Sequence, residues 1–78
     1  MPLAFVLINA EFGQEKSLLT KLKSMKNVKE AYFVYGIYDI IAKIEAKNMN
    51  TVKDIIAFQI RKMNEVKTTL TMSVADVI

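Results

Sequence analysis

The chain has 78 residues, with 11 Lys and Arg against eight Asp and Glu, a formal net charge of +3, and neither Cys nor His. A chain of this length builds one hydrophobic core and makes a single domain of marginal stability. The missing Cys excludes a disulfide-stabilised fold, and the missing Cys and His remove the ligands that a metal carrier needs.

A strand and a helix are predicted first. Residues 3–8 form an unbroken apolar run between Pro2 and Asn9, which is typical of a strand with both faces covered. Over residues 14–25, apolar side chains recur at helical spacing with Lys residues on the opposite side. This pattern predicts an amphipathic helix, and Gly13 is placed to open it.

A β-hairpin follows in the middle of the chain. Residues 28–35 and 40–46 are predicted as strands, and residues 36–39 as the turn between them. The corner carries Tyr35, Tyr38 and the acid Asp39. In a chain without His or Cys, this hairpin is the main place where polar chemistry can be concentrated.

The second helix has two candidate caps, Asn48 and Asn50, and Thr51 with Asp54 resembles a capping box. The pattern leaves the start of this helix open. Its expected buried stripe consists of Val52, Ile55, Ile56, Gln59, Ile60 and Met63.

The last predicted strand covers residues 66–74, and its alternation separates an apolar face from a polar one. The first face is expected to hold Val66, Thr68, Leu70, Met72 and Val74, and the second Lys67, Thr69, Thr71 and Ser73. The hydroxyl row on the second face is another polar feature that could serve a site.

The element order β-α-β-β-α-β predicts an α+β, ferredoxin-like fold, a four-stranded antiparallel sheet with two helices on one face. The first and third strands are then central, and the helix-free face is left open. Its first-strand residues are either Ala4, Val6 and Ile8 or Leu3, Phe5 and Leu7, and alternation does not decide between the two sets. Either set makes an apolar patch that calls for a partner, most simply a second copy packed sheet to sheet.

Several functions are disfavoured by missing residue types. One Arg is too few for sequence-specific DNA contact, and Phe5 is the only aromatic residue on the central strands where an RNA-binding sheet would stack bases. Without His or Cys, a general base would have to be Asp39, Glu45 or a Lys, and none is spaced to pair with a nucleophile. The initial apolar run is too short to span a membrane and lacks a basic leader, so we expect a cytoplasmic protein.

Three segments together resemble one known family. The segment VYGIYDIIAKIEAKN is similar to the hairpin of the ligand-binding domain of Lrp/AsnC transcription regulators, where a strand runs into Gly, a variable residue, an aromatic residue and Asp. KNVKEAYFVYG resembles the segment that leads to that Gly, and NEVKTTLTMSV resembles the last strand, with Val66, Thr69 and Thr71 at matching spacing. The resemblance covers essentially the whole chain, with Glu65 where the family usually has Gly.

The resemblance implies one ligand-binding domain over residues 1–78, without the helix-turn-helix domain that these regulators usually carry. It implies a small effector, usually an amino acid, and no cofactor, no membrane and no direct nucleic-acid contact. It also implies a homo-oligomer, in which the domain dimerises through its sheet and dimers join into an octamer or another ring. A full-length Lrp/AsnC regulator is a further candidate partner.

The resemblance also assigns site residues. One wall of a pocket between dimers would consist of Tyr35, Gly36, Ile37, Tyr38 and Asp39, and hydroxyls from the last strand would come from Thr69 and Thr71. This set suits a zwitterion, because turn N–H groups can hold a carboxylate while Asp39 or carbonyl oxygens hold an ammonium.

Each assigned residue also has a structural interpretation. Gly36 can be a turn glycine with positive φ, and Asp39 can accept N–H groups within its turn. Tyr35 and Tyr38 can fill space between subunits, and the two Thr residues can simply be good strand formers. For the whole chain, the alternatives are a small oligomeric enzyme of the dimeric α+β barrel type and a purely structural oligomerisation module.

Overall fold

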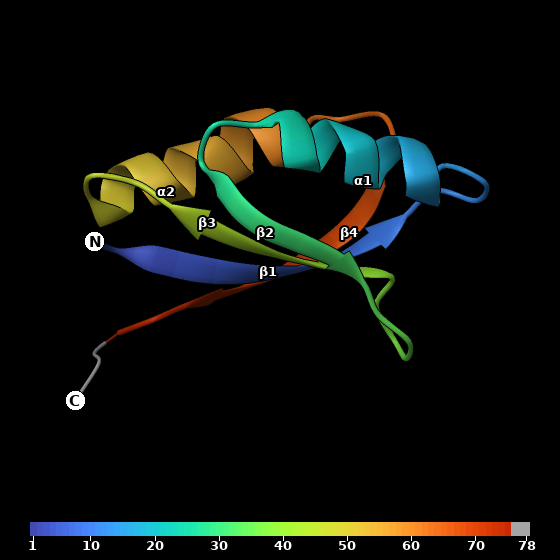
Figure 1. Cartoon of the computed structure of the whole chain (residues 1–78), viewed down its shortest axis with the longest axis horizontal. Helices are drawn as coiled ribbons and strands as arrows, with labels where there is room; N and C mark the ends of the chain where they lie inside the picture. Colours follow the sequence, from blue (N-terminus) through green and yellow to red (C-terminus); the bar gives the residue numbers. More distant parts are fainter. Residues whose placement is uncertain (76–78) are drawn as a thin grey trace.

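The computed structural model describes residues 1–75. In chain order the elements are β1 (Leu3–Ala10), α1 (Glu15–Ser24), β2 (Val28–Phe33), β3 (Ile40–Glu45), α2 (Met49–Ile55), η1 (Ile56–Ile60) and β4 (Val66–Ser73). The strands form one antiparallel sheet in the order β2-β3-β1-β4. The helices cover a single face of this sheet (Figure 1). The predicted ferredoxin-like fold with β1 and β3 at its centre is therefore confirmed.

Strand β1 decides which side chains face the helices. Ala4, Val6 and Ile8 have no exposed surface, whereas the alternate residues of the strand are half-buried and point to the helix-free face. Cross-strand register continues this division, because Leu7 lies opposite both Ile41 of β3 and Leu70 of β4. The helix-free face thus carries the set that begins with Leu3, Phe5 and Leu7, and one chain leaves it open.

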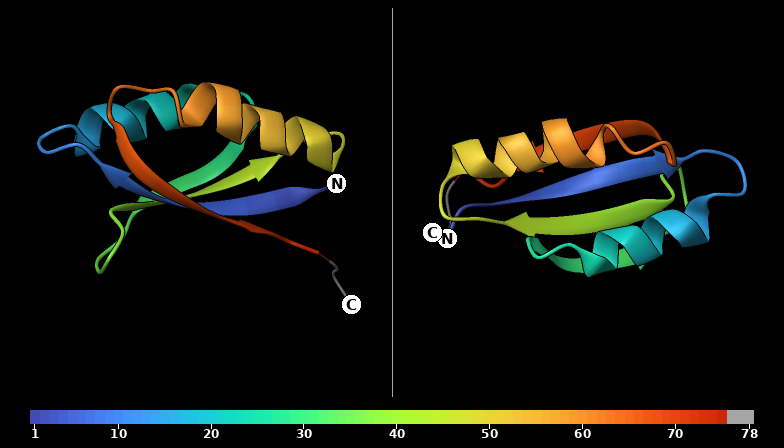
Figure 2. Two further views of the ribbon diagram at one scale, coloured as in Figure 1. Left: turned by 180° about the vertical axis from the view of Figure 1, so that it is seen from behind. Right: turned by 90° about the horizontal axis from the view of Figure 1, so that it is seen from above.

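The core lies between the sheet and a single layer made of two helical segments, α1 and α2 with η1 (Figure 2). Seen from above, α1 lies over the β2–β3 half of the sheet, and α2 with η1 lies over the β1–β4 half (Figure 2). Leu18 and Leu22 of α1 and Val52 and Ile60 of the second helical segment are completely buried. Burying a side chain of this size contributes about 1.5–3 kcal/mol to the free energy of unfolding. These residues therefore hold both helical segments on the sheet.

The second helix begins at one of the two predicted caps. Asn48 is the N-cap, and its Oδ1 accepts both the Thr51 N–H at 2.8 Å and the Thr51 hydroxyl at 3.0 Å. Thr51 lies inside the helix, so a capping box that starts at Thr51 is wrong. An Asn cap of this kind stabilises a helix by about 1 kcal/mol.

The end of this helix departs from the expected pattern. Residues Ile56–Ile60 form a π-helical turn, in which hydrogen bonds join residues five apart. The wider turn continues the buried stripe from Ile56 to Ile60 and leaves Gln59 exposed. The prediction that Gln59 is buried is therefore wrong, because it assumed α-helical spacing throughout.

Strand β4 contains an irregularity that the alternation did not show. Ala10 of β1 pairs with Val66, and Asn9 pairs with Thr68, so Lys67 is an extra residue in the ladder. This bulge turns Val66 toward the core, which it packs against, whereas Thr68 and the following alternate residues face the open side. The prediction that Val66 shares a face with Thr68 is wrong for this reason.

The helix-free side also carries the connection between β2 and β3. This loop, residues 34–39, hangs away from the helical layer in both side views (Figure 1 and Figure 2). Strand β2 ends at Phe33 instead of the predicted Tyr35, although the Val34 N–H still donates to the Asp39 carbonyl oxygen at 2.9 Å. In the described part of the chain, no helix is both long and apolar enough to cross a membrane.

Candidate functional site

The tip of the hairpin loop exposes two large side chains. Tyr35 is completely exposed and Ile37 is 85% exposed. Gly36 between them has φ +130°, and a Cβ added there would meet nothing within 4 Å. The loop therefore needs glycine at position 36 for its backbone conformation and not because a side chain would clash. Its tip exposes the Tyr35 and Ile37 side chains on the surface of the protomer.

Asp39 fastens the base of the loop to the end of β1. Its N–H donates to the Ile8 carbonyl oxygen at 3.0 Å, and its Oδ2 accepts the Ala10 N–H at 2.9 Å. The hydrogen bonds found among residues 1–75 engage Oδ2 and leave Oδ1 without a donor. The side chain is half-buried, as is that of Tyr38 beside it. Asp39 therefore has a structural role at the base of the loop.

Thr69 and Thr71 lie on the helix side of the sheet. They pair across the ladder with Ile8 and Val6, whose side chains are in the core. Thr69 is half-buried and Thr71 is exposed because β4 is an edge strand. The hairpin tip projects from the other side, with β1 between the two groups. One protomer therefore holds the seven predicted residues as two separate groups.

Two adjoining hollows run along the free edge of β4, and we call them together the β4 groove. The first has a volume of about 350 Å³ and is lined by Lys53, Ile56, Ala57, Arg61, Thr71 and Ser73. The second, also about 350 Å³, is lined by Arg61, Val66, Lys67, Thr68 and Thr69. Both contain basic side chains and hydroxyls, and among residues 1–75 no acid and no hairpin residue lines either hollow.

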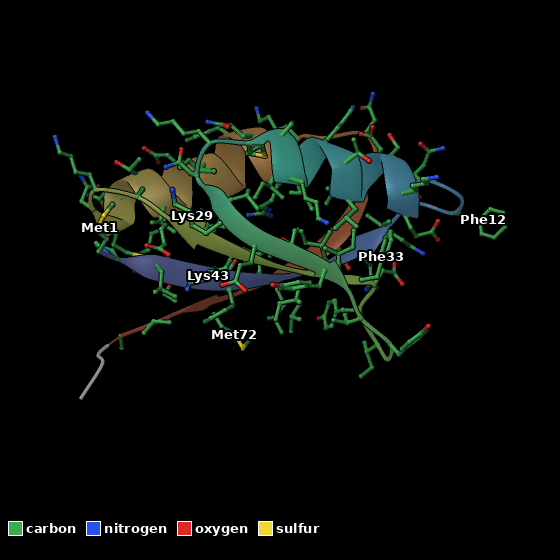
Figure 3. The ribbon with its side chains drawn as sticks, in the orientation of Figure 1. Met1, Phe12, Lys29, Phe33, Lys43 and Met72 are labelled. Atoms are coloured by element: carbon green, nitrogen blue, oxygen red, sulfur yellow. The ribbon has the colours of Figure 1, made fainter. Side chains whose placement is uncertain are left out.

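The helix-free face has an apolar half and a polar corner. Phe5, Leu70 and Met72 make the apolar half, and Figure 3 shows Met72 pointing away from the helices. At the corner, the Tyr32 hydroxyl donates to Glu30 at 2.8 Å, and Lys43 Nζ lies 3.5 Å from the same carboxylate. The Tyr32 bond lowers the pKa of Glu30 and raises that of Tyr32. An apolar patch with a charged edge is typical of a protein interface.

Glu65 is a buried acid at the start of β4. Its Oε2 lies 2.6 Å from Lys21 Nζ and accepts the Ser17 hydroxyl at 3.2 Å, while the Glu65 carbonyl oxygen accepts the Glu11 N–H at 2.8 Å. Hydrogen bonding from Lys21 holds the pKa of Glu65 below its usual value. Glu65 therefore ties α1 to the ends of β1 and β4.

Sequence reasoning missed Glu65 and Arg61. Glu65 stands where the resemblance leads one to expect Gly, yet no non-glycine residue within 1–75 has a positive φ, so this turn does not require one. The departure from the family pattern was the available signal for Glu65. For Arg61 the signal was that it is the chain's single Arg. No cluster of three or more acids that could hold a metal ion occurs among residues 1–75.

Comparison with known proteins gives a consistent result. A family model described as the Lrp/AsnC ligand binding domain matches residues 3–78. The regulatory protein AsnC of Escherichia coli strain K12 is 31% identical over 58 residues, which are 74% of this chain and 38% of AsnC. The chain thus matches well under half the length of its curated relatives.

Solved structures extend the comparison to the whole fold. The crystal structure of FFRP-DM1 shares 42% identity with a TM-score of 0.92 and covers 95% of this chain and 99% of its own. A transcriptional regulator from Neisseria meningitidis, solved as its complex with L-Met, has a TM-score of 0.86 over 99% of this chain and 51% of its own. Its identity of 13% shows a shared fold and no more.

Proposed function

The chain belongs to the family of Lrp/AsnC ligand-binding domains, which are parts of transcription regulators, and from this premise we propose that it is a homo-oligomeric sensor of an amino acid or a related metabolite. Its site would combine the hairpin of one copy with the Thr69 and Thr71 hydroxyls of another. The description of the matching family as a ligand-binding domain supports an effector site of this kind.

The observation that carries the proposal is the separation of the two residue groups. The hairpin tip, with Tyr35 and Ile37, projects from the helix-free side, while Thr69 and Thr71 face the β4 groove. Asp39 and Thr69 both border Ile8 of β1, so it is the loop tip, with Tyr35 and Ile37, that an effector in the groove would reach only from another copy of the chain. Exposed apolar side chains at a loop tip are also stabilised when another subunit covers them.

Dimerisation through the helix-free face supplies the first level of assembly. Its apolar half includes Leu70 and Met72, which are 46% and 47% exposed in one chain. A two-fold axis would place the same apolar half of a second copy against it and leave the Glu30, Tyr32 and Lys43 corner at the rim. Dimers would then join into a ring through the hairpins.

Effector binding would change assembly, because a ligand held between copies stabilises only the assembled state. Such a module could act alone or by joining a full-length Lrp/AsnC regulator in the cytoplasm. We propose binding without turnover. Of the candidate general bases, Glu45 lies 3.7 Å from Lys43 Nζ, and Asp39 already accepts the Ala10 N–H through one oxygen, which supports binding over proton transfer.

A thermal-shift screen of the twenty amino acids, combined with light scattering, tests this function. We expect at least one amino acid to raise the melting temperature and to change the particle mass, with the ligand recovered unchanged by mass spectrometry. If no amino acid does either, the sensor function is rejected. If the ligand is recovered in altered form, the domain is an enzyme.

A further inference from the structure

Arg61 occupies the centre of the β4 groove. It lines both hollows, with Lys53 in the first and Lys67 in the second. Two cations elsewhere in the fold are paired with acids, since Lys43 lies near Glu30 and Glu45, and Lys21 near Glu65. Within residues 1–75, Arg61, Lys53 and Lys67 have no carboxylate oxygen within 4 Å. The groove therefore gathers three positive charges that no acid of residues 1–75 neutralises by an ion pair.

The π-helical turn sets the direction of Arg61. The Arg61 N–H donates to the Ile56 carbonyl oxygen at 2.9 Å, five residues earlier in the chain. A continuous α-helix has 3.6 residues per turn, so one inserted residue rotates the side chains after it by roughly 100° around the axis. The inserted residue thus aims Arg61 at β4. Single π turns in α-helices are frequently found at functional sites.

The neighbours of Arg61 suit a small anion with an apolar part. The guanidinium presents a planar set of donors that fits a carboxylate or a phosphate with two hydrogen bonds. Thr71 and Ser73 offer hydroxyl donors in the same hollow, and Lys53 adds a point charge. Ile56 and Ala57 supply an apolar wall on the helix side. Thr71 and Ser73 lie on the helix side of β4. The residues of β1 that pair with them, Val6 and Ala4, belong to the core.

We propose that the β4 groove binds the carboxylate or phosphate group of a small molecule, with Arg61 as the anchoring residue. The proposal rests on the proposed function in one respect, that Thr69 and Thr71 contact an effector. For an amino-acid effector, Arg61 holds the carboxylate. The ammonium is then left for Asp39 Oδ1 of another copy, which accepts no hydrogen bond from residues 1–75 of its own copy.

One Arg in the chain makes a direct test possible, because its side-chain Nε–H gives a single NMR signal. The full chain is titrated with each amino acid, with the carboxamide of any amino acid that binds, and with inorganic phosphate. We expect the Arg61 Nε–H signal to shift and saturate with a carboxylate or phosphate ligand and to stay unchanged with the carboxamide.

Three variants test the role of the side chain. Arg61→Met should weaken binding on the order of tenfold, because a hydrogen-bonded charge pair is lost, and Arg61→Lys should weaken it less. Lys16→Met removes the same charge from an exposed position on α1 that does not line the groove, and it should bind like wild type. Far-UV circular dichroism confirms that each variant is folded.

The outcomes separate this proposal from the proposed function. Saturation by an amino acid supports both, and saturation by phosphate alone supports the anion site while it rejects an amino-acid effector. If an amino acid stabilises the protein but neither the Arg61 signal nor the Arg61→Met affinity changes, the anion site is rejected and the sensor function stands. If no ligand shifts the Arg61 signal, the anion site is rejected.

Discussion

Asp39 accepts the backbone N–H of Ala10 through Oδ2 at 2.9 Å. The acid that the family resemblance assigns to effector binding therefore also holds the base of the hairpin loop against β1. The effector role that we propose for Asp39 would use its other oxygen, Oδ1. A substitution that removes the whole carboxylate therefore mixes a loss of binding with a loss of structure, and a pair of variants is needed to separate them.

Asp39→Ala should lower the free energy of unfolding by about 1–3 kcal/mol, because it leaves the Ala10 N–H without its acceptor. Asp39→Asn keeps an oxygen for that N–H and removes only the charge, so its stability should stay within about 1 kcal/mol of wild type. Urea unfolding measures both values. Effector affinity should fall in both variants, and normal affinity in Asp39→Asn would leave Asp39 with a structural role alone.

The apolar half of the helix-free face leads to a prediction about the oligomeric state. Leu70→Lys places a charge in the middle of the apolar half, where a second copy would bury it, and should shift the particle mass from dimer or larger to monomer. Because Leu70 is 46% exposed in one chain, the fold itself should be kept. Gln59→Lys, on the exposed side of the helical layer, is the matched control. Sedimentation analysis that finds Leu70→Lys as large as wild type would rule out this interface.

The two glycines with positive φ, Gly36 and Gly13, should differ in how much a substitution by Ala destabilises the fold. Both have positive φ, +130° at Gly36 and +77° at Gly13, and both have open space where a Cβ would lie. Gly13→Ala requires the left-handed helical region and should cost about 1–2 kcal/mol. Gly36→Ala requires a region that is nearly restricted to glycine and should cost more, up to about 3 kcal/mol. Denaturant unfolding of the two variants tests the order.

Glu65 predicts a pH dependence of stability. Its folded pKa lies below the usual value because of Lys21, so folding favours the ionised carboxylate. The stabilisation is complete above the unfolded pKa and is lost as the pH falls through the lowered folded pKa. Melting temperatures measured from pH about 7 to about 3 should therefore fall less steeply for Lys21→Met than for wild type. Parallel curves would show that this pair does not contribute.

Sequence patterns predicted the elements well because hydrophobic periodicity records which faces are buried. The alternation of β3 and the apolar run of β1 led directly to the sheet. Local irregularities were not visible in this way. The extra residue Lys67 reverses the face of Val66, and the π turn exposes Gln59, and both depend on how distant elements pack.

The site was predictable only as far as single residues carry a signature. Gly36 and Asp39 were assigned to the proposed site because the hairpin segment resembles that of the Lrp/AsnC ligand-binding domain, whereas turn chemistry gave both residues a structural interpretation. Arg61 and Glu65 were missed because their importance arises from neighbours that are distant in sequence, the β4 hydroxyls for Arg61 and Lys21 for Glu65. A lone Arg in a Lys-rich chain was the one local hint.

The central claim is that the effector binds between copies of the chain. Its most direct test is calorimetric titration of the effector into wild type and into the Leu70→Lys monomer, with the particle mass followed in parallel. We predict that wild type binds and that the monomer, although folded, binds at least tenfold more weakly, because each copy holds only part of the site. Equal affinity in the monomer would show that one chain contains the complete site and would contradict this account.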